Sequence, residues 1–511
     1  MTIIDDAVDV LLETDSYKLG HKNMYVKNTE VVYSNLTARG ARNPDITYGT
    51  VFFGLQAFLY RLTEKWNVFF NLSTADMEEA LDKYTEFVDE MLGPNNVGNE
   101  QFRELHELGH LPLRVRAFRE GSIVPLRVPY FTIENTDERF FWLTNYLETA
   151  ISANMWHPIT SATIAWSNRR LLDERAALSS DTALVDFQGH DFSYRGMEGD
   201  YAAAASGAGH LVSFKGTDTL PAIRFAKRYY NGDNGLVGCS VPATEHAVMC
   251  SGIAVYGEGD RLAGEVAVFE QLLDQHPEGI LSVVSDSFDL WGVCTKILPA
   301  LKDKIMARDG KLVIRPDSGD PELILCGDPD APEGTPQRAG AINLLAEVFG
   351  TTVNNKGYKE LNQHIGAIYG DSINRDRADS ITANLMRQGY ASTSSVFGFG
   401  SFTYQFQTRD TFKMAVKATW TQVGGRGYDI LKDPITDDGS KKSATGRLAV
   451  RRMMNGEPYL IQNATAEQEA NQELELVYEN GAMLRHQSFA NVRETLARET
   501  ELLARREGVN A

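Results

Sequence analysis

Two short segments of the sequence carry residue types that could bind and transform a small charged substrate. They are His190-Asp-Phe-Ser-Tyr-Arg-Gly196 and Phe214-Lys-Gly-Thr-Asp218, and each follows an apolar run that predicts a buried strand. Arg195 and Asp218 therefore come just after strand ends, which is where ligands bind in α/β folds. An arginine and an aspartate in these positions predict a substrate with one anionic end and one hydrogen-bond-donating end.

A third segment, Lys311-Leu-Val-Ile-Arg-Pro-Asp317, repeats the pattern of a strand followed by charged residues. Pro316 fixes its own φ and favours an extended Arg315, so both charged side chains are held in defined directions. The arginine fork suits phosphate oxygens, and the carboxylate of Asp317 suits ribose hydroxyls or a metal ion. A structural arginine–aspartate pair that caps the strand is the alternative interpretation.

Four further strand ends supply polar or small residues. Asp286 suits either ligand contact or a helix N-cap, and His246 suits either phosphate contact or a structural role in the core. The turns Gly370-Asp371 and Gly398-Phe-Gly-Ser401 provide glycines at which backbone N–H groups could approach a phosphate, or which simply form tight loops. Neither a GxGxxG nor a P-loop motif stands between a strand and a helix.

The spacing of the apolar runs indicates the elements that position these residues. Intervals such as 220–230 and 262–275 are long enough for a helix, which predicts parallel βαβ units. We therefore predict an α/β fold in which residues 181–401 form an irregular, TIM-like βα barrel with the site at its rim. The runs predicted as strands are 184–187, 211–214, 237–241, 281–285, 312–315, 365–369 and 395–398.

The flanking segments differ from this middle region. Residues 110–135 and 402–461 alternate with a period of two and predict antiparallel strands, whereas 138–178 and 491–507 are typical of helices. Residues 1–180 together with 402–511 are therefore predicted to form a discontinuous, β-rich second domain.

Composition excludes several classes of partner. The 511 residues carry a net charge of −19, which argues against nucleic acid or an anionic membrane surface. No window approaches the roughly 20 apolar residues of a membrane span, and the N-terminus lacks the pattern of a secretory signal. The 4 cysteines show no metal-binding spacing. We expect a cytoplasmic protein with reduced thiols.

Several of these segments resemble the nicotinamide phosphoribosyltransferase family of type II phosphoribosyltransferases. The resemblance runs in order from about residue 12 to 490. It is carried by Asp15-Ser-Tyr-Lys18, Gly109-His-Leu-Pro112, Glu134-Asn-Thr-Asp137, His190-Asp-Phe-Ser-Tyr-Arg-Gly196, Phe214-Lys-Gly-Thr-Asp218, Ser240-Val-Pro-Ala-Thr-Glu-His246, Val284-Ser-Asp-Ser-Phe-Asp289, Ile314-Arg-Pro-Asp-Ser-Gly319 and Lys432-Asp-Pro434.

The resemblance implies a reaction and its requirements. Nicotinamide and phosphoribosyl pyrophosphate would give nicotinamide mononucleotide and pyrophosphate, with Mg²⁺ as cofactor, in NAD salvage. It also implies a homodimer with shared active sites, and ATP as a coupled substrate that phosphorylates the family's histidine at the place of His246.

Roles for individual residues follow by matching position. Phe192 and Tyr17 of the partner subunit would stack on the pyridine ring, while Asp218 would accept from the carboxamide. The leaving pyrophosphate and the ribose or metal would be held by Arg195, His246, Asp286, Arg315, Pro316 and Asp317, with Asp286 and Asp317 facing the metal through water. The ribose 5′-phosphate would be held by Gly370, Asp371, Ser401 and Arg409, with Arg39 and Lys417 across the interface. The catalytic set would be His246, Asp218, Arg315 and Asp317.

The residue at position 218 bears on the choice of base. A carboxylate accepts from a carboxamide but repels the carboxylate of nicotinic acid, which favours nicotinamide. A nicotinate or quinolinate phosphoribosyltransferase, the first alternative, should present a cation there. A non-catalytic binding protein on the same scaffold, the second alternative, should have lost Arg195, Asp218 or Arg315, and all are present.

Overall fold

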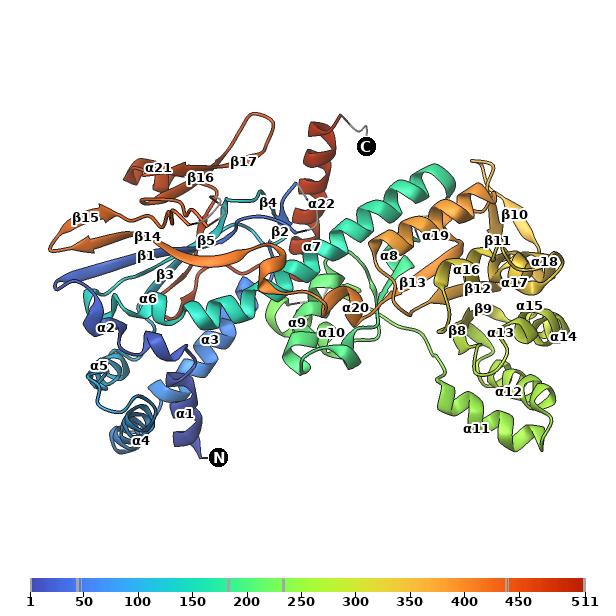
Figure 1. The fold of residues 1–511 in the computed structure, drawn as a ribbon, viewed down its shortest axis with the longest axis horizontal. Coiled ribbons are helices and arrows are strands. Elements are labelled where there is room, and N and C mark those ends of the chain that lie inside the picture. Colours follow the sequence, from blue (N-terminus) through green and yellow to red (C-terminus); the bar gives the residue numbers. More distant parts are fainter. Residues whose placement is uncertain are drawn as a thin grey trace. The chain divides into compact units, whose positions relative to one another are not determined.

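The computed structural model describes residues 2–42, 46, 48–181, 184–231, 235–436, 439 and 441–508. The chain divides into two compact units, whose elements are labelled in Figure 1. The first, here called the antiparallel unit, comprises Met1–Thr163, Phe225–Gly235 and Gln407–Ala511. The second, here called the parallel unit, comprises Ile164–Arg224 and Leu236–Phe406.

The unit borders, after residues 163 and 406, differ from the 181 and 401 expected from the sequence, and residues 225–235 return to the antiparallel unit. Aromatic packing explains that return. The Tyr230 ring stacks on Phe53 at 5.3 Å between centroids and meets the edge of Phe489 at 6.0 Å. Its hydroxyl donates to Glu120 Oε2 at 2.7 Å, so the end of α10 (Leu220–Tyr230) belongs to that core.

The antiparallel unit is built on a seven-stranded sheet in the order β15-β14-β1-β5-β3-β18-β19. Strand β1, from the N-terminal part of the chain, pairs with β5 on one side and with β14 on the other. Strands from both ends of the chain therefore share one sheet. Its strands are β1 (Thr29–Ala38), β3 (Leu113–Ala117), β5 (Pro129–Asn135), β14 (Met414–Val423), β15 (Arg426–Asp429), β18 (Glu475–Glu479) and β19 (Ala482–Met483). Two antiparallel pairs stand beside them, β2 (Thr50–Val51) with β4 (Ile123–Val124) and the hairpin of β16 (Leu448–Arg452) with β17 (Pro458–Gln462).

Helices such as α1 (Ile3–Leu11) and α5 (Glu100–Leu108) are amphipathic and bury one face each. The expected helices over 138–178 and at the C-terminal tail are present. The main helices are α1 (Ile3–Leu11), α3 (Leu55–Phe70), α4 (Thr74–Leu92), α5 (Glu100–Leu108), α22 (Phe489–Arg506) and α7 (Glu148–Ser179), which contains the unit border. Within the described part of the chain, no helix has both the length and the apolar character that crossing a membrane needs.

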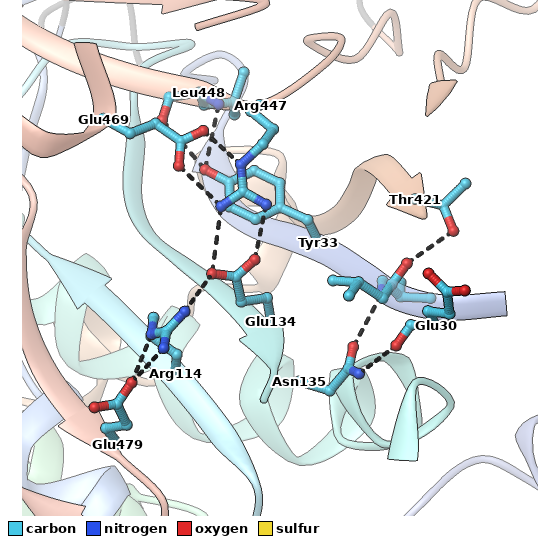
Figure 2. Close-up of polar contacts among 12 residues, drawn as sticks. Glu30, Tyr33, Arg114, Glu134, Asn135, Thr421, Arg447, Leu448, Glu469 and Glu479 are labelled. Atoms are coloured by element: carbon cyan, nitrogen blue, oxygen red, sulfur yellow. Dashed lines mark hydrogen bonds and ion pairs between the residues drawn. The ribbon is translucent and has the colours of Figure 1, made fainter. Parts of the chain in front are cut away.

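A buried ion-pair network fastens the start of β16 to the sheet (Figure 2). Arg447 donates to Glu134 on β5 at 2.8 Å and to Glu469 at 2.9 Å. Its guanidinium lies over the rings of Tyr33 and Trp420, at 4.5 and 5.0 Å from the ring centroids. Burial alone would lower the pKa of Arg447, but the bonds to the two carboxylates raise it. The charge is therefore paired rather than merely buried.

The parallel unit contains a six-stranded, all-parallel sheet in the order β7-β6-β13-β12-β9-β8. The sheet is a curled half-barrel, so the α/β class is confirmed but a TIM-like barrel is not. Four of the predicted strands are confirmed by β8, β9, β12 and β13. The strands are β6 (Gly189–Asp191), β7 (Gly216–Thr217), β8 (Glu278–Val284), β9 (Asp309–Arg315), β12 (Ile365–Tyr369) and β13 (Ser395–Phe399), beside the hairpin β10 (Thr351–Val353) with β11 (Lys359–Leu361).

The remaining predicted strands are wrong in detail. The run 184–187 begins a helical turn, α8 (Val185–Gln188), and the run 211–214 follows the end of α9 (Asp200–Leu211). Short apolar runs suit a buried helix as well as a buried strand, so periodicity alone could not decide. Strand β6 follows the first run and β7 follows the second. Arg195 and Asp218 therefore still come after strand ends.

The run 237–241 forms isolated bridges instead of a strand. Cys239 bridges to Gly216 at one edge of the sheet, and Ala243 bridges to Ser282 at the other edge. The backbone bonds of Thr217 N to Cys239 O and of Thr244 N to Ser282 O are 2.9 and 3.0 Å long. This closing segment, residues 239–244, therefore contacts both edge strands of the half-barrel.

Helices surround the parallel sheet and supply residues to its rim (Figure 1). The core between helices and sheet is formed by buried aliphatic and aromatic side chains such as Leu281, Ile314 and Phe397. The main helices are α9, α11 (His246–Gly257), α12 (Arg261–Gln275), α18 (Ala341–Phe349), α19 (Arg375–Arg387) and the short α20 (Ser401–Tyr404).

Candidate active site

A cavity of about 820 Å³ opens at the carboxyl ends of the parallel strands. It brings together most of the residues that the sequence singled out in this unit. The predicted residues that line it are Phe192, Arg195, Asp218, His246, Arg315, Asp317, Gly370, Asp371 and Ser401.

Phe192 lies after β6 and is held from two sides by glycines. Its backbone N–H donates to Phe399 O at 2.9 Å. A Cβ placed on Gly398 would lie 2.2 Å from Cδ2 of the Phe192 ring, and one on Gly370 would lie 2.8 Å from the same atom. The Phe192 ring therefore leaves room only for glycine at both positions. Gly400, by contrast, has open space where a Cβ would stand.

Asp218 follows β7 and is exposed to the cavity. The Ser240 hydroxyl from the closing segment donates to its Oδ1. The neighbouring His190 ring lies over Gly216, where a Cβ would come within 2.5 Å of it. Burial lowers the pKa of His190 and the charge of Asp218 opposes that shift. One carboxylate oxygen is thus oriented by the protein, and the other can accept from a ligand.

The two predicted arginines reach the cavity from different elements. Arg315 ends β9, and its Nη2 donates to Thr244 O at 2.6 Å, while its buried Nε has no protein partner. Pro316 is buried behind it, as expected of a residue that fixes the chain direction. Arg195 is exposed in the turn η3 (Tyr194–Gly196), where Gly196 faces the Ser401 hydroxyl closely. Both guanidinium groups are available to an anion.

His246 begins α11, and half of its side chain (51%) is exposed. Its Nδ1 lies 3.2 Å from Ser287 Oγ, and its Nε2 lies 4.0 Å from Oδ1 of the largely buried Asp286. Asp286 Oδ2 accepts from the backbone N–H of Asp317 at 2.9 Å and from the Ser318 hydroxyl at 2.6 Å. Asp286 therefore orients the loop that carries Asp317, and its Oδ1 has no hydrogen-bond partner.

Acidic side chains gather where β8, β9 and β12 end. Burial, together with the negative charges of Asp371, Asp286 and Asp317, raises the pKa of the Tyr369 hydroxyl. Among the described residues, no three acidic, histidine or cysteine side chains converge as a direct metal site. The arrangement instead suits Mg²⁺, which keeps several waters and binds one or two carboxylates together with substrate phosphates.

The antiparallel unit carries the remaining predicted residues. Arg39 and Lys417 line a basic pocket of about 240 Å³ together with Arg127 and Lys442. Burial and the nearby charge of Arg39 lower the pKa of Lys417, although Glu148 opposes them at 3.4 Å. Tyr17 is 63% exposed, and Arg409 is exposed in the turn η6 (Arg409–Thr411).

Sequence reasoning missed several residues of the cavity. Ser240, which orients Asp218, begins the motif Ser240–His246, but a serine in a turn gives no signal of that role. Asp200, which accepts from the Tyr194 hydroxyl at 2.9 Å, and Phe402 gave no pattern that could have identified them.

Comparison with known proteins gives the family. The nicotinate phosphoribosyltransferase (NAPRTase) family model matches residues 187–482, and the nicotinamide phosphoribosyltransferase N-terminal domain model matches residues 9–115. The nicotinamide phosphoribosyltransferase of Acinetobacter baylyi is 45% identical, with 97% of this chain and 98% of that protein covered. That of Xanthomonas campestris pv. campestris is 34% identical, with coverage of 95% and 97%.

Solved structures support the fold. Nicotinate-nucleotide pyrophosphorylase from Pyrococcus furiosus superimposes with a TM-score of 0.57 at 16% identity, covering 98% of this chain and 96% of that one. Human nicotinic acid phosphoribosyltransferase gives a TM-score of 0.51 at 16% identity, covering 96% and 94%. The Acinetobacter and Xanthomonas relatives are matched over nearly their whole length, and both family models match. The chain therefore belongs to the nicotinamide phosphoribosyltransferases of the nicotinate phosphoribosyltransferase family.

Proposed function

We propose that the cavity of the parallel unit transfers the phosphoribosyl group from phosphoribosyl pyrophosphate to nicotinamide, giving nicotinamide mononucleotide and pyrophosphate. One observation carries this proposal. A single cavity combines an aromatic face and a carboxylate, Phe192 and Asp218, with the cations Arg195 and Arg315. The first pair suits an uncharged pyridine carboxamide, and the second suits a pyrophosphate.

The residues act by orientation and charge. Displacement of pyrophosphate at C1 of the ribose develops positive charge on the sugar and negative charge on the leaving group. Arg195, Arg315 and His246 would stabilise the leaving oxygens, while Phe192 and Asp218 would hold the pyridine nitrogen toward C1. No covalent nucleophile is required.

We propose Mg²⁺ as the cofactor that neutralises the pyrophosphate. Asp317 and Asp286 would hold it through bound water, and the acidic rim around Tyr369 and the unpartnered Oδ1 of Asp286 support this assignment. Asp371, Gly370 and Ser401 would receive the ribose 5′-phosphate at the other side of the cavity.

We also propose that ATP assists turnover by phosphorylating His246. The exposed imidazole and the carboxylate of Asp286 at 4.0 Å support this role, because a nearby carboxylate orients the ring. The imidazole nitrogen would displace ADP from the γ-phosphorus of ATP, and phosphohistidine hydrolysis would release phosphate.

A homodimer with shared sites is proposed for the residues of the antiparallel unit. The exposed ring of Tyr17 would cover the second face of the base, and the basic pocket of Arg39 and Lys417 would complete the phosphate site in the partner subunit, where Arg409 would act beside Ser401. We propose further that the closing segment turns the half-barrel into an irregular barrel.

We also propose that the enzyme works in the cytoplasm, where its four thiols stay free.

The choice of base is tested by Asp218→Asn. An uncharged amide no longer repels nicotinate and accepts less strongly from a carboxamide, so the ratio of kcat/KM for nicotinamide over nicotinate is expected to fall by about tenfold or more. Both bases are assayed with phosphoribosyl pyrophosphate, with and without ATP. Asp200→Asn removes a carboxylate from the same cavity and should keep the ratio. A ratio unchanged in Asp218→Asn would contradict the proposed carboxamide contact, and wild-type preference for nicotinate would favour the nicotinate alternative.

The role of the Phe192 ring is tested by Gly398→Ala. Because the added methyl would overlap the ring, the ring must move, and the KM for nicotinamide is expected to rise by about tenfold. Gly400→Ala adds the same methyl where nothing lies within 4 Å, so this KM should stay near the wild-type value. Equal KM values in the two variants would remove Phe192 from base binding.

A further inference from the structure

A chain of buried hydrogen bonds connects two elements of the parallel unit that do not adjoin in sequence. The Tyr404 hydroxyl lies 2.6 Å from His210 Nδ1, and His210 Nε2 lies 3.0 Å from Gly216 O. Tyr404 and His210 are both fully buried. The bonds therefore connect the last residue of α20, through α9, to the first residue of β7.

The direction of each bond follows from the groups that make it. A carbonyl oxygen can only accept, so His210 Nε2 carries the proton and donates to Gly216. His210 Nδ1 is then the acceptor, and the Tyr404 hydroxyl is the donor. Burial and the charge of Asp191 raise the pKa of Tyr404, so the hydroxyl keeps the proton that it donates.

The two ends of this chain lead to opposite parts of the substrate site. Tyr404 closes the helical turn that Ser401 begins, and Ser401 lines the cavity at the proposed phosphate end. Gly216 stands two residues before Asp218, whose backbone N–H is fixed by Asp191 O at 2.9 Å. The bonds thus connect α20 to the strand that precedes Asp218.

Aromatic rings flank the bonds. The His210 ring stacks on Phe214 at 5.0 Å between centroids and is tilted against Phe399 at 6.4 Å. Polar groups in such a place cost stability unless they are bonded to each other, and their geometry is then sharply defined. An aliphatic side chain at position 404 would fill the space without this directional bond.

We propose that Tyr404 and His210 are positioning residues that couple the phosphate-binding turn to Asp218, so that phosphoribosyl pyrophosphate improves the binding of nicotinamide. This inference rests on the proposed function. Phosphate binding at Ser401 fixes the position of α20. The bonds through His210 then fix β7 and the Asp218 carboxylate that follows it. Because coupling between two ligands is reciprocal, nicotinamide should improve the binding of phosphoribosyl pyrophosphate by the same factor.

The test compares Tyr404→Phe with a matched control. Tyr390→Phe also removes one hydroxyl from a buried tyrosine of the parallel unit, where it donates to Asn343 Oδ1 at 2.9 Å. We expect Tyr404→Phe to raise the KM for nicotinamide at saturating phosphoribosyl pyrophosphate by about fivefold, the effect of one hydrogen bond. Tyr390→Phe should lower Tm about as much as Tyr404→Phe does. It should leave the KM values for nicotinamide and for phosphoribosyl pyrophosphate unchanged.

A double-mutant cycle shows whether the bond itself carries the effect. His210→Gln keeps an N–H for Gly216 O but takes away the ring nitrogen that accepts from Tyr404. The changes in KM of His210→Gln and Tyr404→Phe should therefore not add in the double variant. Additive changes, or equal KM shifts in Tyr404→Phe and Tyr390→Phe, would overturn the coupling.

The same assay separates this inference from the function on which it rests. An active wild-type enzyme with an unchanged nicotinamide KM in Tyr404→Phe overturns the coupling alone. A wild-type enzyme that forms no nicotinamide mononucleotide overturns the proposed function and the coupling together. If Tyr404→Phe does not fold, His210→Gln compared with Tyr390→Phe gives the same decision.

Discussion

Replacement of Arg315 by alanine is expected to lower kcat by about 10²–10³-fold, as the loss of one preorganised charge-stabilising donor does in other enzymes. The guanidinium is held at the end of β9 by its bond to Thr244 O, and its position in the cavity suits the oxygens of a leaving pyrophosphate. Because the leaving group gains charge during the reaction, kcat should change more than the KM for nicotinamide. Steady-state rates of nicotinamide mononucleotide formation measure this effect.

Two further variants separate charge, geometry and stability. Arg315→Lys keeps the charge but not the planar fork, so its kcat should lie between those of the wild type and the alanine variant. Arg308 stands just before the other end of β9, buried and bonded to His276 O at 2.8 Å. Arg308→Ala should lower Tm and leave the kcat of the folded enzyme unchanged. A wild-type kcat in Arg315→Ala would refute the pyrophosphate assignment.

The second large effect is expected for stability, in Arg447→Ala. This substitution leaves the carboxylates of Glu134 and Glu469, whose side chains are 11% and 16% exposed, without their shared cation. Breaking a buried pair by removing one partner costs about 3–5 kcal/mol, so the unfolding transition of the antiparallel unit should move to a much lower denaturant concentration. Equilibrium unfolding in urea, followed by tryptophan fluorescence because Trp420 packs on Arg447, measures this shift.

The matched control uses another arginine on an aromatic ring of the same sheet. Arg426 lies over Tyr428 at 5.2 Å, but it is exposed on the edge strand β15. Arg426→Ala should change the unfolding free energy by less than about 1 kcal/mol. Similar losses in the two variants would show that the ion pairs around Arg447 add nothing beyond the ring contact.

The sequence predicted the chemistry of the site better than the elements that carry it. β8, β9, β12 and β13 contain apolar runs between turn signals, so their ends, with Asp286, Arg315 and Asp371, could be located. The strands before Phe192 and Asp218 are only three and two residues long, and the longer apolar runs beside them are partly helical. Periodicity cannot identify such short strands.

Other features depend on tertiary packing and have no local pattern. The sequence indicates only phosphate-binding or tight-loop glycines at positions 370 and 398, because the ring that needs their space lies far away in sequence. The return of residues 225–235 to the antiparallel unit depends on Phe53 and Phe489, from opposite ends of the chain. The Tyr404–His210 bond likewise joins residues that give no signal separately.

The length of the closing segment also limits the distance between two groups of the cavity. Ser240 fixes the Asp218 carboxylate at one of its ends, and Thr244 fixes the Arg315 guanidinium at the other. Four extended residues span about 13 Å at the usual rise of a strand, so chain length alone limits how far base and leaving group can stand apart. An enzyme of this architecture can change its side chains here, but a single inserted or deleted residue would alter the distance between its two substrate sites.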